Sequence, residues 1–274
     1  MKADRQAPIG VFDSGVGGLT VAREIMRQIP NERIVYFGDT ARVPYGSKSK
    51  DNIIKFSRQI IRFLQTENVK AIVIACNTAS ALALDEMQQE FDLPILGVVK
   101  PGAKVAVETT ANKRIGLIGT EANIRSGVYT RYIKSLDDEA KVFEKACPLF
   151  VPLVEEGWLH DDITLQVASR YLEELKEKDI DTLIMGCTHY PLIRSTIRKV
   201  MGDKVNLVNP AYETAIELKN LLERDNLANK CDVDSPSSMY RFYVSDAEEK
   251  FKLFANSILP FDITMTKQIN IENY

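Results

Sequence analysis

The chain has 274 residues, of which 45% are hydrophobic and 27% are charged, and its formal net charge is −3. This composition is ordinary for a globular protein of one large or two modest domains, and the lack of a basic block argues against binding to nucleic acid or a membrane surface. No run approaches the roughly 18 apolar residues of a membrane span, and the N-terminal residues lack the apolar core of a signal peptide, so we expect a cytoplasmic protein. The four cysteines do not follow a disulfide-framework spacing and are expected to be free thiols.

The first hundred residues alternate between predicted strands and helices. In chain order, we predict a strand at 9–12, a helix at 19–29, a strand at 34–38, a loop at 40–47, a helix at 51–65, a strand at 71–75, a helix at about 78–90 and a strand at 95–99. The glycine-rich turn before the first helix exposes backbone N–H groups that attract an anion. Because Thr20 stands where the GxGxxG fingerprint has its last glycine, a simple tight turn is equally consistent with this segment.

From residue 114 the pattern starts again. We predict a strand at 115–118, a helix near 123–135, a strand at 142–146, a short loop or helical turn at 151–157, a helix at 163–178 and a strand at 182–185. There follow a strand at 205–208, a helix from 210 to about 224, a polar loop at 225–238, a strand at 239–244 and a helix at 247–258.

Two half-length units are therefore indicated. The segment IGLI begins 106 positions after the similar IGVF, and Cys187 follows Cys76 by 111 positions. We predict an α/β fold of two similar domains with mainly parallel sheets, related by a pseudo-two-fold axis, with the active site in the cleft between them. The elements after 210 exceed a simple duplication and are expected to pack on the first unit. We therefore assign 1–100 and 211–274 to the first domain, and 101–210 to a second, inserted domain.

The segments AIVIACNTAS (71–80) and TLIMGCTHYP (182–191) share one pattern. In each, an apolar strand stops at a cysteine, Cys76 or Cys187, and Asn or Thr begins the next helix. Ligands bind at this edge of an open α/β sheet. A thiol at a helix N-terminus is expected to have a pKa below its usual value of about 8.5. If the two units face each other, the two thiols approach one cleft from opposite sides.

Two thiols on opposite faces of a carbon atom suit stereoinversion, because one thiolate removes a proton and the other thiol supplies one. His189 follows Cys187 closely, and Asp13 is a candidate proton partner for Cys76. Preorganised donors would stabilise the carbanionic transition state. The candidate donors are Asn77, Thr78 and Thr188. Neither a Schiff-base lysine motif nor a phosphate cup is apparent, so we expect no cofactor.

Five segments resemble glutamate racemase, a cofactor-independent member of the aspartate/glutamate racemase family. They are DSGVGGLTV (13–21), DTARVPYG (39–46), ACNTAS (75–80), VPLVEEG (151–157) and GCTHYPL (186–192). The resemblance covers most of the chain, with the region after about 226 contributing least, and it implies interconversion of L- and D-glutamate to supply D-glutamate for peptidoglycan. Aspartate racemases share the two-cysteine arrangement but are similar over less of the chain, and His189 after Cys-Thr favours glutamate.

The resemblance also implies roles for individual residues. Cys76 and Cys187 exchange the proton on the two faces of the substrate, Asp13 and His189 assist them, and Asp39 and Glu155 are further polar members of the site. The implied substrate-binding residues are Asp13, Ser14, Tyr45, Gly46, Asn77, Thr78, Thr188 and His189. The partner is the small molecule glutamate, and neither nucleic acid nor a membrane is expected. We also expect a homodimer and a lid at the loop that carries Tyr45.

Other interpretations remain open for several of these features. Asp39 and Glu155 are equally consistent with structural roles, and Cys147 and Cys231 are interpreted as ordinary thiols. A metal at Cys187 and His189 is disfavoured because a zinc site needs three or four ligands. The alternative function is a small-molecule binding or sensor protein of the same fold, in which the thiols are redox-responsive or incidental. An NAD-dependent dehydrogenase is disfavoured by the missing final glycine.

Overall fold

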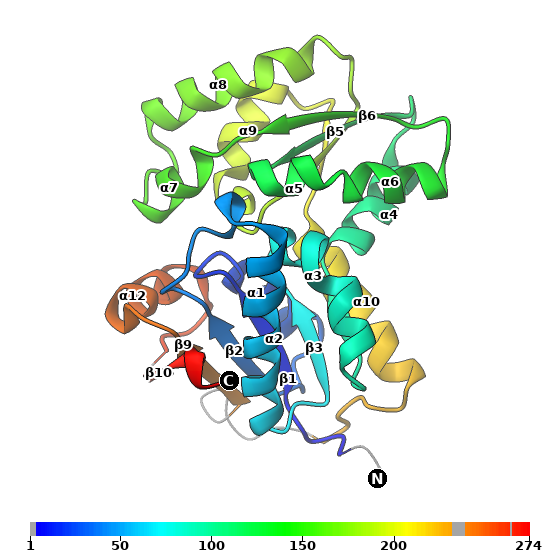
Figure 1. The fold of residues 1–274 in the computed structure, drawn as a ribbon. Coiled ribbons are helices and arrows are strands. Elements are labelled where there is room, and N and C mark those ends of the chain that lie inside the picture. The colour runs from blue at the N-terminus through cyan, green and yellow to red at the C-terminus, as the bar shows by residue number, and fades with distance from the viewer. Residues whose placement is uncertain (1–3, 232–238, 264) are drawn as a thin grey trace.

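The computed structural model describes residues 4–231, 239–263 and 265–274. These residues form two α/β units, each built on a parallel β-sheet (Figure 1). The six-stranded sheet has the order β10-β9-β2-β1-β3-β4, and the four-stranded sheet has the order β6-β5-β7-β8. We call the parts around these sheets the first and the second unit. The predicted α/β fold with two mainly parallel sheets is confirmed.

The strands of the first unit are β1 (Ile9–Asp13), β2 (Ile34–Gly38), β3 (Ala71–Ile74), β4 (Ile95–Gly97), β9 (Tyr240–Val244) and β10 (Thr266–Gln268). Those of the second are β5 (Arg114–Gly119), β6 (Lys141–Ala146), β7 (Thr182–Gly186) and β8 (Asn206–Val208). The helices near the first sheet are α1 (Leu19–Gln28), α2 (Lys50–Thr66), α3 (Asn77–Glu90), α10 (Pro210–Arg224) and α12 (Glu248–Ile258). Those near the second are α4 (Val99–Thr109), α5 (Glu121–Ser126), α6 (Val128–Leu136), α7 (Phe150–Glu155), α8 (Asp162–Lys176) and α9 (Arg194–Met201). Short 3-10 helices lie at Tyr45–Ser47, Tyr190–Ile193 and Ile271–Asn273.

The internal repeat predicted from the sequence is visible in the strand order. The run β2-β1-β3-β4 of the first sheet has the same connectivity as β6-β5-β7-β8 of the second. Ile9 pairs with Ile34 on one side and with Ala71 on the other, and Ile115 correspondingly pairs with Val142 and Thr182. The two cysteine-bearing segments therefore follow equivalent strands, β3 and β7.

Alternate side chains of each central strand enter the cores on the two faces of its sheet, as the period of two requires. In β1, Val11 packs in the core under α1, α10 and α12, whereas Phe12 packs in the core under α2 and α3. In the second unit, Met185 packs with α7, α8 and α9, and Ile184 packs with α4 and α6. Both sheets are thus covered on two faces, which leaves their strand ends to form a site.

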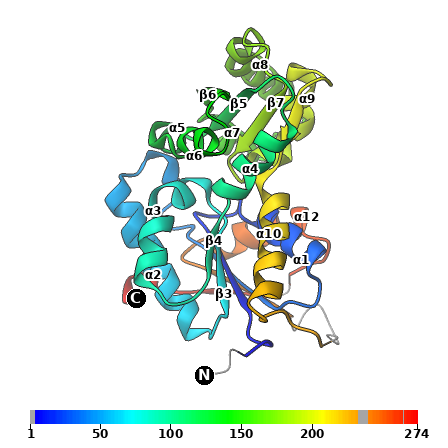
Figure 2. The same cartoon turned by 90° about the vertical axis from the view of Figure 1, so that its right-hand side faces the viewer.

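The chain passes between the units through α4 and α10, which pack against each other (Figure 2). A Cβ atom at Gly102 of α4 would lie 2.9 Å from Pro210 Cγ at the start of α10, so the absence of a side chain allows this close crossing. The domain boundaries expected from the sequence, at 100/101 and 210/211, fall within the first turns of these two helices.

Several elements differ from the sequence prediction. The strand expected at 95–99 ends at Gly97, and Val99 already belongs to α4, which was not predicted. The helix expected near 123–135 is two helices, because Gly127 between them is left-handed with φ of 61°. Neither α9 nor β10 was predicted. Part of the expected polar loop, residues 232–238, lies outside the described residues.

Among the residues that the structure describes, each helix is too short or too polar to cross a membrane.

Candidate active site

The two units enclose a cavity of about 30 Å³ at the carboxyl ends of their central strands. Residues that follow β1, β3, β5 and β7 all reach it: Ser14, Cys76, Thr120 and Cys187. The lining also includes Val43, Pro44, Tyr45, Gly46, Asn77, Thr78, Val151, Thr188 and His189. The structure therefore brings the two predicted thiols to one cavity from opposite units.

Cys76 immediately precedes α3 and is buried. Burial raises the pKa of its thiol to about 12, and the charge of Asp13 adds to this effect, although the Ala79 N–H and the Ser14 side chain donate to the sulfur and oppose it. The sequence-based prediction of a lowered pKa is wrong for Cys76 because desolvation outweighs the helix N-terminal donors. In this state of the site Cys76 is a thiol that can supply a proton.

Cys187 belongs to a chain of contacts that ends at the edge of the site. Its Sγ lies 3.7 Å from Nδ1 of His189, whose Nε2 lies 3.1 Å from Oε1 of Glu155. Burial lowers the pKa of His189, but its contacts with Cys187 and Glu155 and the charge of Asp13 outweigh burial and raise that pKa to about 10. The hydrogen bond with His189 in turn lowers the pKa of Glu155. A protonated imidazole therefore stands beside the thiol of Cys187.

Asp13 is fully buried behind the cavity lining. One carboxylate oxygen accepts from the Gly15 N–H at 3.1 Å, and the other accepts from the Thr188 hydroxyl at 3.4 Å. Burial raises the pKa of Asp13, while His189 opposes the rise. Asp13 thus contacts the second unit and acts electrostatically on both Cys76 and His189.

The glycine-rich turn after β1 provides space for side chains. A Cβ atom at Gly17 would lie 2.5 Å from His189 Nδ1, and one at Gly18 would lie 2.3 Å from Asp13 Cβ. Gly18 has φ of −62°, which any residue can adopt, so its requirement for glycine comes from close packing and not from backbone conformation. The absence of side chains at Gly17 and Gly18 therefore allows the catalytic candidates His189 and Asp13 to pack closely against this turn.

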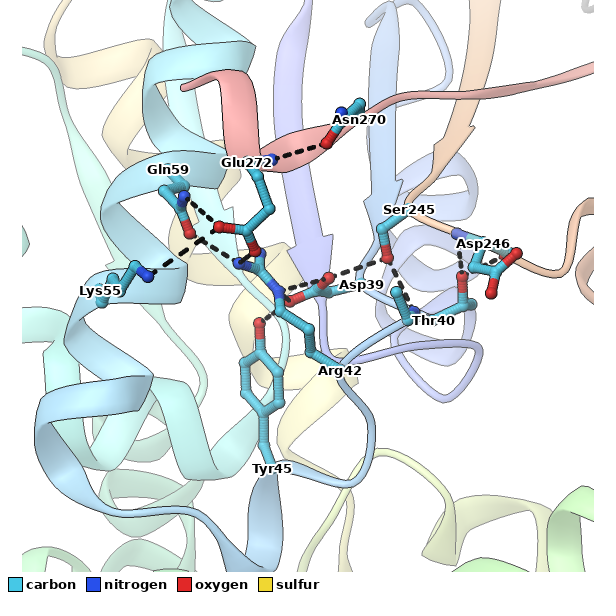
Figure 3. A network of polar contacts seen from close by, with 11 residues as sticks. Asp39, Thr40, Arg42, Tyr45, Lys55, Gln59, Ser245, Asp246, Asn270 and Glu272 are labelled. Atoms are coloured by element: carbon cyan, nitrogen blue, oxygen red, sulfur yellow. Dashed lines mark hydrogen bonds and ion pairs between the residues drawn. The ribbon is translucent and has the colours of Figure 1, made fainter.

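The carboxylate of Asp39 lies outside the cavity lining, in a separate polar network (Figure 3). It accepts from Arg42 Nε at 2.7 Å, from the Ser245 hydroxyl at 2.9 Å and from the Tyr45 hydroxyl. The other end of Arg42 donates through Nη1 to Gln59 at 2.6 Å and to Glu272 at 3.1 Å. Asp39 therefore anchors the loop whose residues Val43 to Gly46 line the cavity.

Besides the contact between Thr188 and Asp13, further hydrogen bonds cross between the units around the cavity. The hydroxyl groups of Thr78 and Thr120 lie 2.9 Å apart, and the Thr20 hydroxyl donates to the Thr188 carbonyl at 3.0 Å. The Tyr129 hydroxyl donates to Asn77 Oδ1 at 2.7 Å. These contacts hold the lining residues of the two units against each other.

The structure collects most of the predicted residues and adds others. Of the predicted set, Glu155 reaches the site through His189, Asp13 lies behind the lining, and Asp39 is removed from it. Sequence reasoning missed Thr120. The internal repeat contains a signal for it, since Thr120 follows β5 as Ser14 follows β1. Cys147 is buried and its carbonyl accepts from the Tyr190 hydroxyl, while Cys231 is exposed.

Within the part of the chain that the structure describes, no group of three or more His, Cys, Asp or Glu side chains is arranged to hold a metal ion.

Comparison with known proteins identifies the family. The Asp/Glu/Hydantoin racemase family model matches residues 9–216. The glutamate racemase of Geobacter metallireducens is 44% identical over 264 residues, which cover 96% of this chain and 97% of that protein. The crystal structure of a glutamate racemase isoform from Bacillus anthracis superposes with a TM-score of 0.92 at 39% identity, covering 97% of this chain and 98% of that one. The glutamate racemase of Francisella tularensis, solved in complex with D-glutamate, gives a TM-score of 0.91 at 38% identity and covers 98% of this chain and 100% of its own. The chain belongs to the Asp/Glu/Hydantoin racemase family and, within it, to the glutamate racemases.

Proposed function

We propose that this racemase interconverts L- and D-glutamate by a two-thiol mechanism in which Cys76 and Cys187 act on opposite faces of the α-carbon. The observation that carries the proposal is that both sulfur-bearing residues line one cavity and come from equivalent positions in the two units. The thiolate on one side removes the α-proton while the thiol on the other side donates a proton to the carbon. After one turnover the thiol and the thiolate have exchanged places, so the reverse reaction uses them in the opposite order.

The charged groups near each thiol support different catalytic roles for Cys76 and Cys187. His189, protonated and linked to Glu155, faces Cys187 and stabilises its thiolate or returns its proton. Cys76 holds its proton because of burial and the nearby Asp13. In the state described by the structure, Cys76 therefore carries the proton that is donated to the carbon, and Cys187 is the thiol that His189 assists.

Glutamate carries two carboxylates, and the lining offers donors for them. Hydroxyl and amide groups surround the cavity at Ser14, Asn77, Thr78, Thr120 and Thr188. These donors are fixed before the reaction, so they can stabilise the negative charge that develops when the α-proton leaves. We assign substrate binding to these residues together with the backbone of Tyr45 and Gly46, whose loop closes the cavity.

The cavity of about 30 Å³ has room for one or two water molecules, and glutamate is much larger. To admit the substrate, either the loop at 43–46 must open or the two units must separate. The first of these motions agrees with a lid at Tyr45. Limited proteolysis tests the lid, with protection of the loop expected on addition of glutamate. Equal cleavage with and without glutamate would count against it.

We also infer a cytoplasmic homodimer that works without a cofactor or a metal and supplies D-glutamate for peptidoglycan. The division of the chain into a first domain of 1–100 and 211–274 and a second of 101–210 belongs to the same proposal. Two domains joined through α4 and α10 could move relative to each other, and this motion would open the small cavity to the substrate.

The decisive experiment follows L-glutamate by circular dichroism, with chelator present and without pyridoxal phosphate, in heavy water. The signal should decay to zero while deuterium enters the α-carbon. Cys76→Ser and Cys187→Ser should each lower kcat by about 10²–10⁴-fold, the usual contribution of a positioned acid or base. Cys231→Ser, at an exposed thiol outside the cavity, is the matched control. Turnover retained in both single variants would refute the two-thiol mechanism, and glutamate binding without turnover in the wild type would favour a binding protein.

A further inference from the structure

Tyr129 lies outside the cavity lining but contacts a residue that belongs to it. It is on α6 of the second unit, is 1% exposed, and donates its hydroxyl to Asn77 Oδ1 at 2.7 Å. Asn77 is the first residue of α3 in the first unit, is 4% exposed and lines the cavity. A buried hydrogen bond thus joins the second unit to a site residue of the first.

The hydroxyl has one role in this contact. Burial and the nearby Cys187 raise the pKa of Tyr129, so the phenol keeps its proton and acts as a donor. An asparagine side chain presents an acceptor at one end and two donors at the other. With Oδ1 bound to the phenol, the NH₂ group remains for a ligand. In the flipped amide, the NH₂ group could donate to the phenol oxygen, but the phenol proton would then lose its acceptor in a buried place.

The orientation of this amide matters because the proposed substrate is an anion with two carboxylates. An NH₂ group directed at a carboxylate donates to it, whereas a carbonyl oxygen in the same place repels it. We propose that Tyr129 is a positioning residue for racemisation, whose hydroxyl holds the Asn77 amide with its NH₂ group available to a substrate carboxylate. The proposal rests on the proposed function of this site.

Because of this contact, the orientation of the Asn77 amide also depends on the relative position of the two units. Tyr129 and Asn77 come from different units, so the hydrogen bond would break if the units separated to admit the substrate and would form again on closure. The donor is therefore aligned in the closed site and free to rotate in the open one. Closure would thereby complete the binding site as well as exclude water.

The test is Tyr129→Phe in the full chain, since phenylalanine keeps the ring and removes only the hydroxyl. We expect kcat/KM for both enantiomers to fall by about 10- to 100-fold, the range that corresponds to a lost buried hydrogen bond with an unsatisfied partner. Tyr132→Phe removes a hydroxyl from the same helix at a residue that does not line the cavity, and it should change kcat/KM by less than about twofold.

A double-mutant cycle separates positioning from a general structural effect. If Tyr129 acts through Asn77, then Tyr129→Phe should change kcat/KM by less than about twofold when Asn77 is already alanine. The same fold-loss in both backgrounds would overturn the proposal, because it would show that the hydroxyl acts independently of the amide.

A binding measurement gives a readout that does not depend on turnover. Calorimetric titration of D-glutamate into the Cys76→Ser/Cys187→Ser variant should show weaker affinity when Tyr129→Phe is added. Unchanged affinity together with unchanged kcat/KM would refute the positioning role while leaving racemisation by the wild type intact. Absence of racemisation by the wild type would instead refute the proposed function, so the two failures can be told apart.

Discussion

Replacing Arg42 by methionine tests how the loop at the cavity is held. The Arg42 side chain is 11% exposed, and its partner Asp39 is fully buried. The guanidinium also lies over the Phe56 ring, 4.1 Å from its centroid. Methionine keeps much of the apolar stem but removes the charge, the fork of donors and the stacking plane.

The expected loss follows from the charge that remains. Without Arg42, the Asp39 carboxylate stays buried, and among the residues that the structure describes only the hydroxyl groups of Tyr45 and Ser245 remain as its side-chain donors. Removing one partner of a buried ion pair costs about 3–5 kcal/mol because the other charge is left uncompensated. We expect the free energy of unfolding to fall by about this amount. The KM for glutamate should also rise, since the loop loses the anchor that holds Tyr45.

Urea denaturation at neutral pH, followed by far-ultraviolet circular dichroism, measures the change as a lower midpoint at an unchanged slope. Arg58→Met is the matched control, because Arg58 pairs with Glu90 at 2.7 Å but both side chains are 33% exposed. An exposed pair of this kind contributes about 1 kcal/mol or less. The double variant Asp39→Leu/Arg42→Met should be more stable than Arg42→Met, since no charge remains buried.

Equal losses in Arg42→Met and Arg58→Met would refute the reasoning. That result would show that solvent reaches Asp39 readily enough to replace the guanidinium. A destabilised Arg42→Met variant with an unchanged KM would keep the ion pair as a stabilising contact but would contradict its role in holding the loop.

Three further predictions concern the site itself. Because the pKa of His189 is raised to about 10, the proton it holds should contribute stability that is fully present below about pH 6.5 and lost as the pH rises towards 10. Glu155→Gln should lower the pKa of His189, which ¹⁵N NMR titration of the imidazole can measure. Gly17→Ala should abolish most racemisation, since its Cβ would lie 2.5 Å from both His189 Nδ1 and Thr188 Oγ1, with secondary structure retained by circular dichroism. Thr120→Val should raise KM by about 5- to 10-fold, because it removes a lining hydroxyl that bonds across the units, as steady-state kinetics can show.

Each of these predictions has a contrary outcome. A His189 resonance that titrates near its ordinary pKa of about 6.5 would contradict the chain of contacts through Glu155. Gly157→Ala provides the steric control, because a Cβ there meets nothing within 4 Å although its φ of 78° strains any other residue, so it should lower stability while retaining far more activity than Gly17→Ala. Normal turnover in Gly17→Ala would show that the two units can separate at no catalytic cost. An unchanged KM in Thr120→Val would remove this residue from substrate binding.

Local sequence was sufficient for the strands, the repeat and the two thiols. Apolar runs such as 71–75 and 182–185 are long enough to be recognised as buried parallel strands, and the equal context of Cys76 and Cys187 indicates one design used twice. The register of the sheets then places both cysteines at equivalent strand ends, as expected. These features could be predicted because they depend on the hydrophobic pattern along the chain.

Only the tertiary structure decided what surrounds each polar group. It directs Asp39 towards Arg42 and away from the cavity, brings Thr120 and Tyr129 from the second unit against α3, and buries Cys76 so deeply that its pKa rises. Hydrogen bonding, desolvation and charge interaction depend on distances between segments far apart in the chain, and a linear pattern contains no such distances. The sequence by itself therefore determined which groups are available for chemistry, while packing between the two units determined their partners, their protonation and their access to substrate.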